Sequence, residues 1–123
     1  MQNPSGTFEV RRTRQFEKDL KQILKRYPDF GKNIQALINT LSIDPEQGEH
    51  IGSGVFKVRI NIEGKPAGDR YGARIIHAVF SIVAKVYLIR VYDKSDTKDL
   101  TLAEIKEIRK LVTAIRKDYK ASR

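Results

Sequence analysis

The sequence contains no cysteine, only two histidines and no long apolar run. Without cysteine, disulfides, thiol catalysis and Cys-ligated metal sites are excluded. No stretch approaches the ~18 apolar residues that cross a bilayer. The first residues, 1–6, also lack the basic and apolar regions of a secretory signal. We therefore expect a soluble, cytoplasmic protein.

Motifs that carry catalysis in other enzymes are equally scarce. His50 lies in a polar stretch and His77 within an apolar one, where a structural histidine is the commoner outcome. No Ser-His-Asp set is present, and residues 64–68 lack P-loop spacing. The acidic residues of 93–99 do not form a metal-binding set. We expect neither a cofactor nor a metal, so any catalysis must use lysine and arginine.

Positive charge is the most distinctive property of the composition. The chain has 24 Lys and Arg against 15 Asp and Glu, a net charge of +9. The excess lies in residues 8–27, 55–98 and 99–123, whereas 28–54 is acidic. A polyanionic partner is therefore expected: nucleic acid, an anionic membrane or an acidic protein. Charge alone does not choose among them.

The hydrophobic pattern predicts one domain over residues 1–123, with frayed ends at 1–6 and about 119–123. A short strand over 7–11 is followed by two amphipathic helices, around 16–27 and 30–41. The break at Pro28-Asp29 joins them into a helical hairpin. Residues 56–62 alternate strictly between apolar and polar, which indicates a half-buried strand.

Two further apolar stretches, 73–82 and 85–94, predict a β-hairpin. Thr101 and Glu104 form a capping-box pattern ahead of an apolar stripe, which predicts a C-terminal helix. The order β-α-α-β-β-β-α indicates an α+β fold: an antiparallel sheet with an N-terminal helical hairpin and a C-terminal helix.

Strand alternation places basic side chains on one face of this sheet. Lys57 and Arg59 share the face opposite Phe56 and are about 6.6–6.8 Å apart. Arg74 opens the next, mostly apolar strand, where its guanidinium needs a carboxylate, a backbone acceptor or a phosphate. With Tyr92 and Lys94, these residues are expected to converge on one concave surface, where a base could stack on the tyrosine ring.

Such a cluster could cleave RNA without a metal. The 2′-OH attacks the adjacent phosphate if a base removes its proton and cations stabilise the developing charge. A lysine among several cations has a lowered pKa and can serve as that base. A site of this kind would be weak alone and would need RNA that a larger partner holds in place.

Several segments, in this order along the chain, resemble one family. They are Phe16…Leu20, 44–48 (DPEQG), 52–60 (GSGVFKVRI), 72–76 (GARII), 86–95 (VYLIRVYDKS) and 99–105 (DLTLAEI). The set resembles the RelE/ParE superfamily of bacterial toxins, in its RelE- and HigB-like branch. Relatives often carry a Gly-Lys-x-Gly-Gly-x-Arg run where this chain has 69–74 (DRYGAR), so Tyr71 replaces a glycine.

The resemblance implies the toxin of a type II toxin–antitoxin pair, which cleaves mRNA on the ribosome without a metal and is neutralised by an antitoxin protein. The family's basic residues on these strands match four positions of this chain, which are the catalytic candidates. The catalytic candidates are Lys57, Arg59, Arg74 and Lys94, and the RNA-binding candidates are Lys65, Arg70, Arg90 and Tyr92. Lys57 or Lys94 is the expected base, and Tyr92 and Tyr119 are candidates for the acid.

Two other functions remain open at this point. A ParE-like toxin would poison DNA gyrase and leave mRNA intact. An inactive toxin-like domain would bind only its antitoxin or an operator complex. The strand cations favour the nuclease, because a binding module has less need of Arg74 at the mouth of a buried strand.

Overall fold

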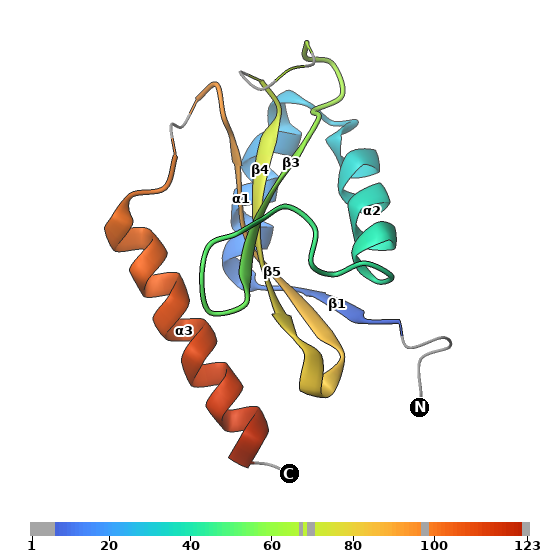
Figure 1. Cartoon of the computed structure of the whole chain (residues 1–123). Coiled ribbons are helices and arrows are strands. Elements are labelled where there is room, and N and C mark those ends of the chain that lie inside the picture. Colours follow the sequence, from blue (N-terminus) through green and yellow to red (C-terminus); the bar gives the residue numbers. More distant parts are fainter. Residues whose placement is uncertain (1–6, 67, 69–70, 97–98, 122–123) are drawn as a thin grey trace.

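The computed structural model describes residues 7–66, 68, 71–96 and 99–121 (Figure 1). The elements are β1 (Glu9–Arg12), α1 (Arg14–Arg26), α2 (Phe30–Leu41), β2 (Glu49–His50), β3 (Val55–Ile60), β4 (Ala73–Phe80), the 3-10 turn η2 (Ser81–Val83), β5 (Lys85–Asp93) and α3 (Leu102–Ala121). The expected order of elements is confirmed, with β2 as an additional short strand. Helix α3 continues through Ala121, so the frayed end expected at about 119 begins inside a helix; residues 1–6 lie outside the described part.

The five strands form one sheet in the order β1-β5-β4-β3-β2. Strands β2 to β5 pair antiparallel, as expected. Strand β1 instead pairs parallel with β5, from Glu9 opposite Lys85 to Arg12 opposite Leu88, so the sheet is mixed. The α+β class is confirmed. The hydrophobic pattern does not report whether an edge strand runs parallel or antiparallel to its neighbour. The parallel pairing of β1 could therefore not be predicted from the sequence.

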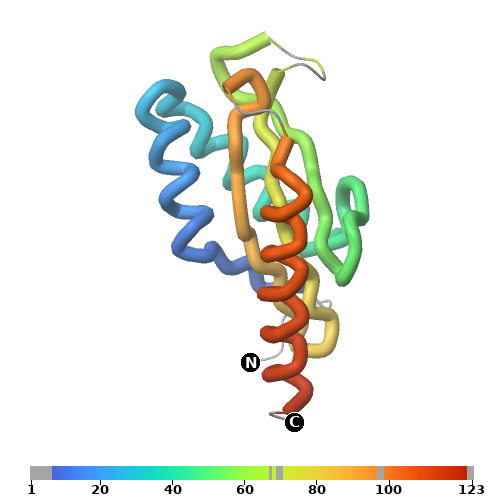
Figure 2. The backbone as a smooth tube through the Cα atoms, turned by 90° about the vertical axis from the view of Figure 1, so that its left-hand side faces the viewer, coloured from blue at the N-terminus to red at the C-terminus, as the bar shows by residue number. Residues whose placement is uncertain are grey.

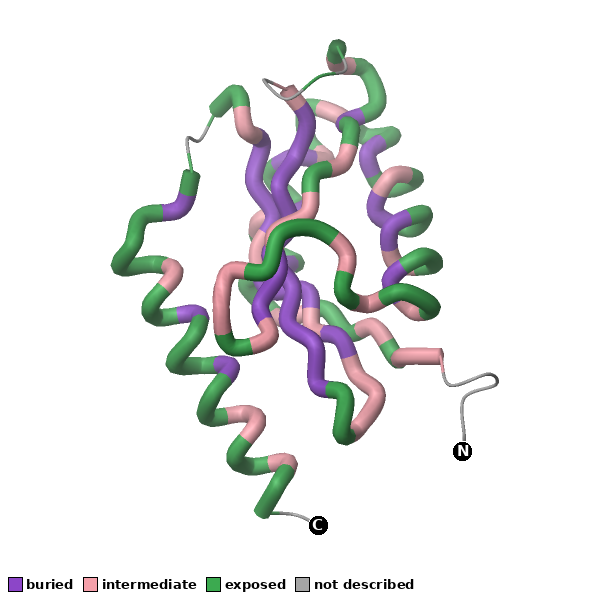
Figure 3. Tube along the Cα trace, in the orientation of Figure 1, coloured by how far each residue is buried: buried purple, intermediate pink, exposed green. Residues whose placement is uncertain are grey.

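The sheet separates two apolar cores. Helices α1 and α2 pack on one face through Phe16, Leu20 and Ile34. Helix α3 covers part of the other face, where Ile108 and Val112 pack with strand residues. Figure 2 shows α3 in front of the sheet and α1, in blue, to its left. Strand β4 is buried along its whole length between these layers (Figure 3).

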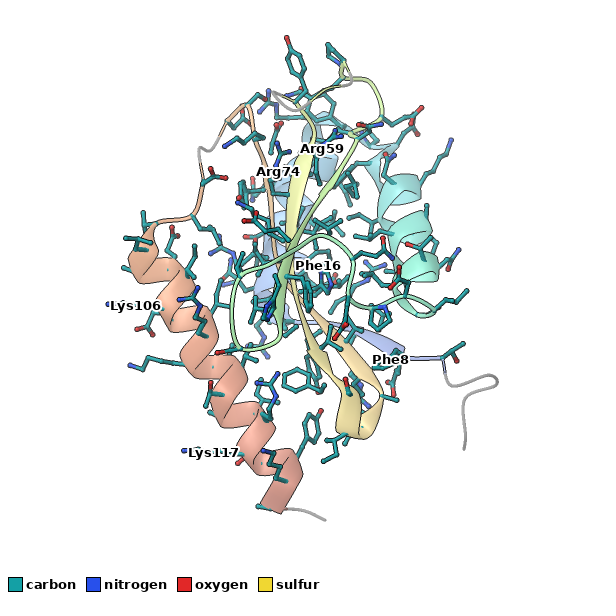
Figure 4. All side chains as sticks on the ribbon, viewed as in Figure 1. Phe8, Phe16, Arg59, Arg74, Lys106 and Lys117 are labelled. Carbon is teal, nitrogen blue, oxygen red and sulfur yellow. The ribbon has the colours of Figure 1, made fainter. Side chains whose placement is uncertain are left out.

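Polar caps fix where the helices begin. The Thr13 hydroxyl accepts a hydrogen bond from the Phe16 N–H at 3.1 Å and so begins α1. The predicted capping box is confirmed at α3: the Glu104 N–H donates to Thr101 Oγ1 at 3.1 Å, and the Thr101 N–H donates to the Glu104 carboxylate at 2.8 Å. The end of the sheet that bears Arg59 and Arg74 lies beyond the start of α3 (Figure 4).

None of the helices in the described part of the chain has the length and apolar character that crossing a membrane requires.

Candidate nucleic-acid interface

Strand register places two arginines and a tyrosine in one row across the sheet. Arg59 on β3 lies opposite Arg74 on β4, which lies opposite Tyr92 on β5. Side chains directly opposite across antiparallel strands stand about 4.5–5.5 Å apart at Cβ, and like charges there oppose folding. Figure 4 shows Arg59 and Arg74 close together on their neighbouring strands. Such a pairing is useful where an anion is to be bound.

The four cations predicted as catalytic line one open pocket of about 330 Å³. The lining residues are Glu49, Lys57, Arg59, Arg74, Lys94 and Asp99. We call this site the cation pocket. Arg59 is exposed, while the Arg74 side chain is 9% exposed and donates to the carbonyl of Tyr71 at 3.2 Å. The pocket therefore combines an exposed guanidinium with one that is buried and bound to the backbone.

The two carboxylates that line the cation pocket, Glu49 and Asp99, were not predicted from the sequence. Glu49 is the register partner of Lys57 in the short strand β2. Asp99 accepts a hydrogen bond from the Tyr92 hydroxyl at 3.2 Å and pairs with Lys94 Nζ at 3.1 Å and Lys57 Nζ at 3.7 Å. The hydrogen bond from Lys94, followed by the charge of Lys57, holds the pKa of Asp99 below its usual value. Asp99 lies in a connection, where no periodicity marks its direction.

Tyr92 contributes its hydroxyl to the pocket and not its ring. The residue is 6% exposed and packs in the core between the sheet and α3. Base stacking on this ring, which the sequence suggested, is therefore not supported. Burial, with a further effect from Asp99, raises the pKa of Tyr92 to about 12. The hydroxyl stays protonated at neutral pH and can donate a proton or a hydrogen bond.

Arg90 lies outside the cation pocket, although it shares the sequence parity of Tyr92. A bulge between Ile76 and His77 pairs Ile76 with Arg90 and His77 with Leu88, which leaves Ile89 as an extra residue. Arg90 Nε binds the Asp19 carboxylate on α1 at 2.7 Å, and Asp19 also accepts from the Val91 N–H at 3.1 Å. Arg90 therefore ties β5 to α1.

Lys65 also has a structural role. Its ammonium binds Asp93 at 3.0 Å, contacts the Ser95 hydroxyl and lies 5.2 Å from the centre of the Tyr27 ring. Burial alone would lower the pKa of Lys65, but the Asp93 carboxylate outweighs it and leaves that pKa raised. This contact pins the connection between β3 and β4 to the end of β5. Arg70 lies outside the described residues.

Gly72 allows β4 to begin beside the pocket. Its φ is +84°, and a Cβ at this position would meet the Ile60 carbonyl oxygen at 2.6 Å. Its own carbonyl accepts from the Lys94 N–H at 3.0 Å. The close approach of these backbones explains why glycine stands two residues before Arg74. It also fixes Lys94 relative to Arg74, across the end of the sheet.

Neither the histidines nor Tyr119 lies at the cation pocket. His77 is fully buried, and its Nε2 donates to the Pro45 carbonyl at 2.8 Å, as a structural histidine does. The Tyr119 hydroxyl bonds that of Tyr87, and its ring packs on Phe80. Phe80 is six residues along β4 from Arg74, or roughly 20 Å. Tyr119 is therefore too far away to protonate a leaving group in the pocket.

Comparison with known proteins places the fold. No family model matches the chain, and no curated protein matches it in sequence. Among solved structures, it is similar to the E. coli toxin RelE in the free state, in a mutant in which two arginines are replaced by alanine. The TM-score is 0.53 at 14% identity, over 75% of this chain and 88% of that one. The chain therefore has the RelE-like fold expected from the sequence.

Proposed function

We propose that this protein is the toxin of a type II toxin–antitoxin pair and cleaves mRNA on the ribosome without a metal. The observation that carries the proposal is the cation pocket on a RelE-like sheet. Lys57 and Arg59 on β3, Arg74 on β4 and Lys94 just after β5 line it together. Lys and Arg provide the electrostatic stabilisation that a dianionic phosphorane requires. The expected partners are an antitoxin protein and ribosome-bound mRNA, in the cytoplasm.

The proposed reaction is an attack of the 2′-oxygen on the adjacent phosphorus. Lys57 or Lys94, in its neutral amine form, accepts the 2′-OH proton and becomes an ammonium, and the new P–O2′ bond forms as the P–O5′ bond breaks. Arg59 and Arg74 hold the non-bridging oxygens and stabilise their developing charge. The leaving 5′-oxygen takes a proton, for which the protonated Tyr92 hydroxyl beside Asp99 is a candidate donor. The products carry a 2′,3′-cyclic phosphate and a 5′-OH.

The pocket is shallow and has no aromatic platform, which supports a requirement for the ribosome. Among the described residues that line it, none is aromatic, so little in it would orient a base. In-line attack needs the 2′-oxygen, phosphorus and 5′-oxygen aligned, and holding reactants in place can supply a large part of a rate enhancement. A decoding site that already holds mRNA extended would provide that alignment.

Induced expression followed by transcriptome-wide mapping of 5′ ends tests the proposal. The wild type is expected to arrest growth and to produce new 5′-OH ends within translated codons. The Arg74→Ala variant should lose these ends by about 100- to 1,000-fold, the usual effect of removing one electrostatic stabiliser. Intact transcripts in arrested cells would rule out the proposed nuclease activity. Supercoiling defects with intact mRNA would instead point to a gyrase poison, and normal growth to a binding domain.

A further inference from the structure

Asp99, which lines the cation pocket, carries a charge of the same sign as the proposed substrate. Asp99 is half-exposed, and its carboxylate contacts Lys57, Lys94 and the Tyr92 hydroxyl. These three donors surround its carboxylate much as they would surround a phosphate. With Glu49 also in the lining, four cations face two carboxylates, so the pocket has a net charge of +2.

The backbone that follows Asp99 is held in place, so rotation of the side chain alone is enough to move its carboxylate away. Leu100 is buried in the core beneath α3, and Thr101 caps that helix. Earlier in the same connection, Asp96 binds Arg26 on α1. The aspartate side chain is short, with two rotatable bonds, and 54% of it is exposed. Rotation into water therefore releases both lysines without disturbing α3.

We propose that Asp99 determines substrate specificity: its carboxylate occupies the anion position between Lys57 and Lys94, and an RNA phosphate must displace it to bind. This inference rests on the proposed function. A free RNA strand gains little from one phosphate contact and must also overcome repulsion from Asp99. RNA fixed by a larger assembly loses less freedom on binding and displaces the carboxylate more readily. Asp99 thus restricts the pocket to pre-positioned RNA.

Binding of a single-stranded RNA that cannot be cleaved tests this directly. The probe is a fluorescent 2′-O-methyl oligonucleotide, whose blocked oxygen prevents attack, and the readout is anisotropy over a range of salt concentrations. Asp99→Asn keeps an oxygen acceptor for Tyr92 but removes the charge, and it should tighten binding about tenfold. The plot of log affinity against log salt should steepen by about 0.7 for each lysine newly available to phosphate.

Two variants control for charge and shape. Asp96→Asn removes the same charge from the same connection but outside the pocket, and it should stay within about twofold of wild type. Asp99→Glu keeps the charge and should also bind as wild type does. Equal tightening by Asp96→Asn and Asp99→Asn would show a net-charge effect only and overturn the proposal. Unchanged or weaker binding by a folded Asp99→Asn would overturn it as well.

Cleavage assays separate this inference from the proposed function. Asp99→Asn is expected to cut free RNA at least several-fold faster than wild type, so the stimulation by ribosomes should fall. If the wild type cuts ribosome-bound mRNA and Asp99→Asn gains no activity on free RNA, the specificity role of Asp99 is wrong while the nuclease stands. If no variant cuts RNA with or without ribosomes, the nuclease and the specificity role both fail, whatever the binding result.

Discussion

Two groups of basic residues at the same end of the sheet differ in the carboxylates they bind. Lys65 and Arg90, the structural cations, bind Asp93 and Asp19, whose side chains are 5% and 12% exposed. Lys57 and Lys94 share one carboxylate, Asp99, whose side chain is 54% exposed. A buried carboxylate cannot exchange its cation for an outside ligand at low cost, whereas an exposed one can. The exposure of the partner carboxylate therefore distinguishes basic residues that stabilise the fold from basic residues that can bind a substrate.

The largest expected effect on stability follows from replacing Lys65. Lys65→Met leaves the Asp93 carboxylate buried with Ser95 as its one hydrogen-bond donor among the residues that the structure describes. Removing one partner of a buried ion pair destabilises by several kcal/mol, so the free energy of unfolding should fall by about 2–4 kcal/mol. Urea unfolding followed by circular dichroism measures this change. A loss below about 0.5 kcal/mol, the level of a surface pair, would remove the distinction between the two groups.

Replacement of Arg90 should cost less. Arg90→Met removes the 2.7 Å contact to Asp19, but the Val91 N–H still donates to that carboxylate. Because Asp19 keeps one donor, we expect the free energy of unfolding to fall by about 1–3 kcal/mol. The same denaturation experiment gives the value. Faster amide exchange at Val91 should accompany it, whereas unchanged exchange would indicate that Arg90 does not hold α1 against β5.

A histidine remote from both groups should give a smaller, pH-dependent effect. Burial lowers the pKa of His77 below 6.5, although its bond to Pro45 opposes this. Between the folded and unfolded pKa values the unfolded chain binds the additional proton, so stability should fall as the pH drops below about 6.5. The slope from this group is at most about 1.4 kcal/mol per pH unit. His77→Gln should flatten stability between pH 5 and 6.5; an unchanged slope would assign it to other groups.

The smallest effects on stability are expected in the cation pocket. Lys57→Met and Lys94→Met each leave Asp99 half-exposed and still bound by the other lysine and by Tyr92. The free energy of unfolding should therefore change by less than about 0.5 kcal/mol. Thermal unfolding of the two variants beside Lys65→Met provides the check. A loss as large as that of Lys65→Met would place these lysines among the structural cations.

The sequence predicted most of the fold because periodicity reports burial. Alternation in β3 correctly placed Lys57 and Arg59 on one face, and the register then brought Arg74 opposite Arg59. Arg90 keeps the parity of Tyr92, because the bulge at Ile89 lies before it, but its guanidinium binds Asp19 on α1. Strand alternation reports the face of a residue and not the tertiary contact that its side chain makes.

The place of Asp99 in the pocket and the contact of Lys65 with Asp93 were not predicted, for a different reason. Both residues lie in connections, whose side chains point where tertiary contacts direct them. Their partners, Lys94 and Asp93, are neighbours at the end of β5, yet one lies in the pocket and the other is buried. Local sequence does not encode which of two adjacent residues a loop side chain will reach.

Cleavage of ribosome-bound mRNA by charge-matched variants tests the central claim most directly. Each of three variants, Lys57→Met, Lys94→Met and Lys110→Met, removes one positive charge; Lys110 lies on the exposed face of α3. If the cation pocket is the site of action, the first two should lose cleavage by at least about 100-fold. Lys110→Met should stay within about threefold of wild type. Equal, small losses of cleavage in all three variants would contradict the account. They would show that Lys57 and Lys94 contribute only through the net charge of the protein.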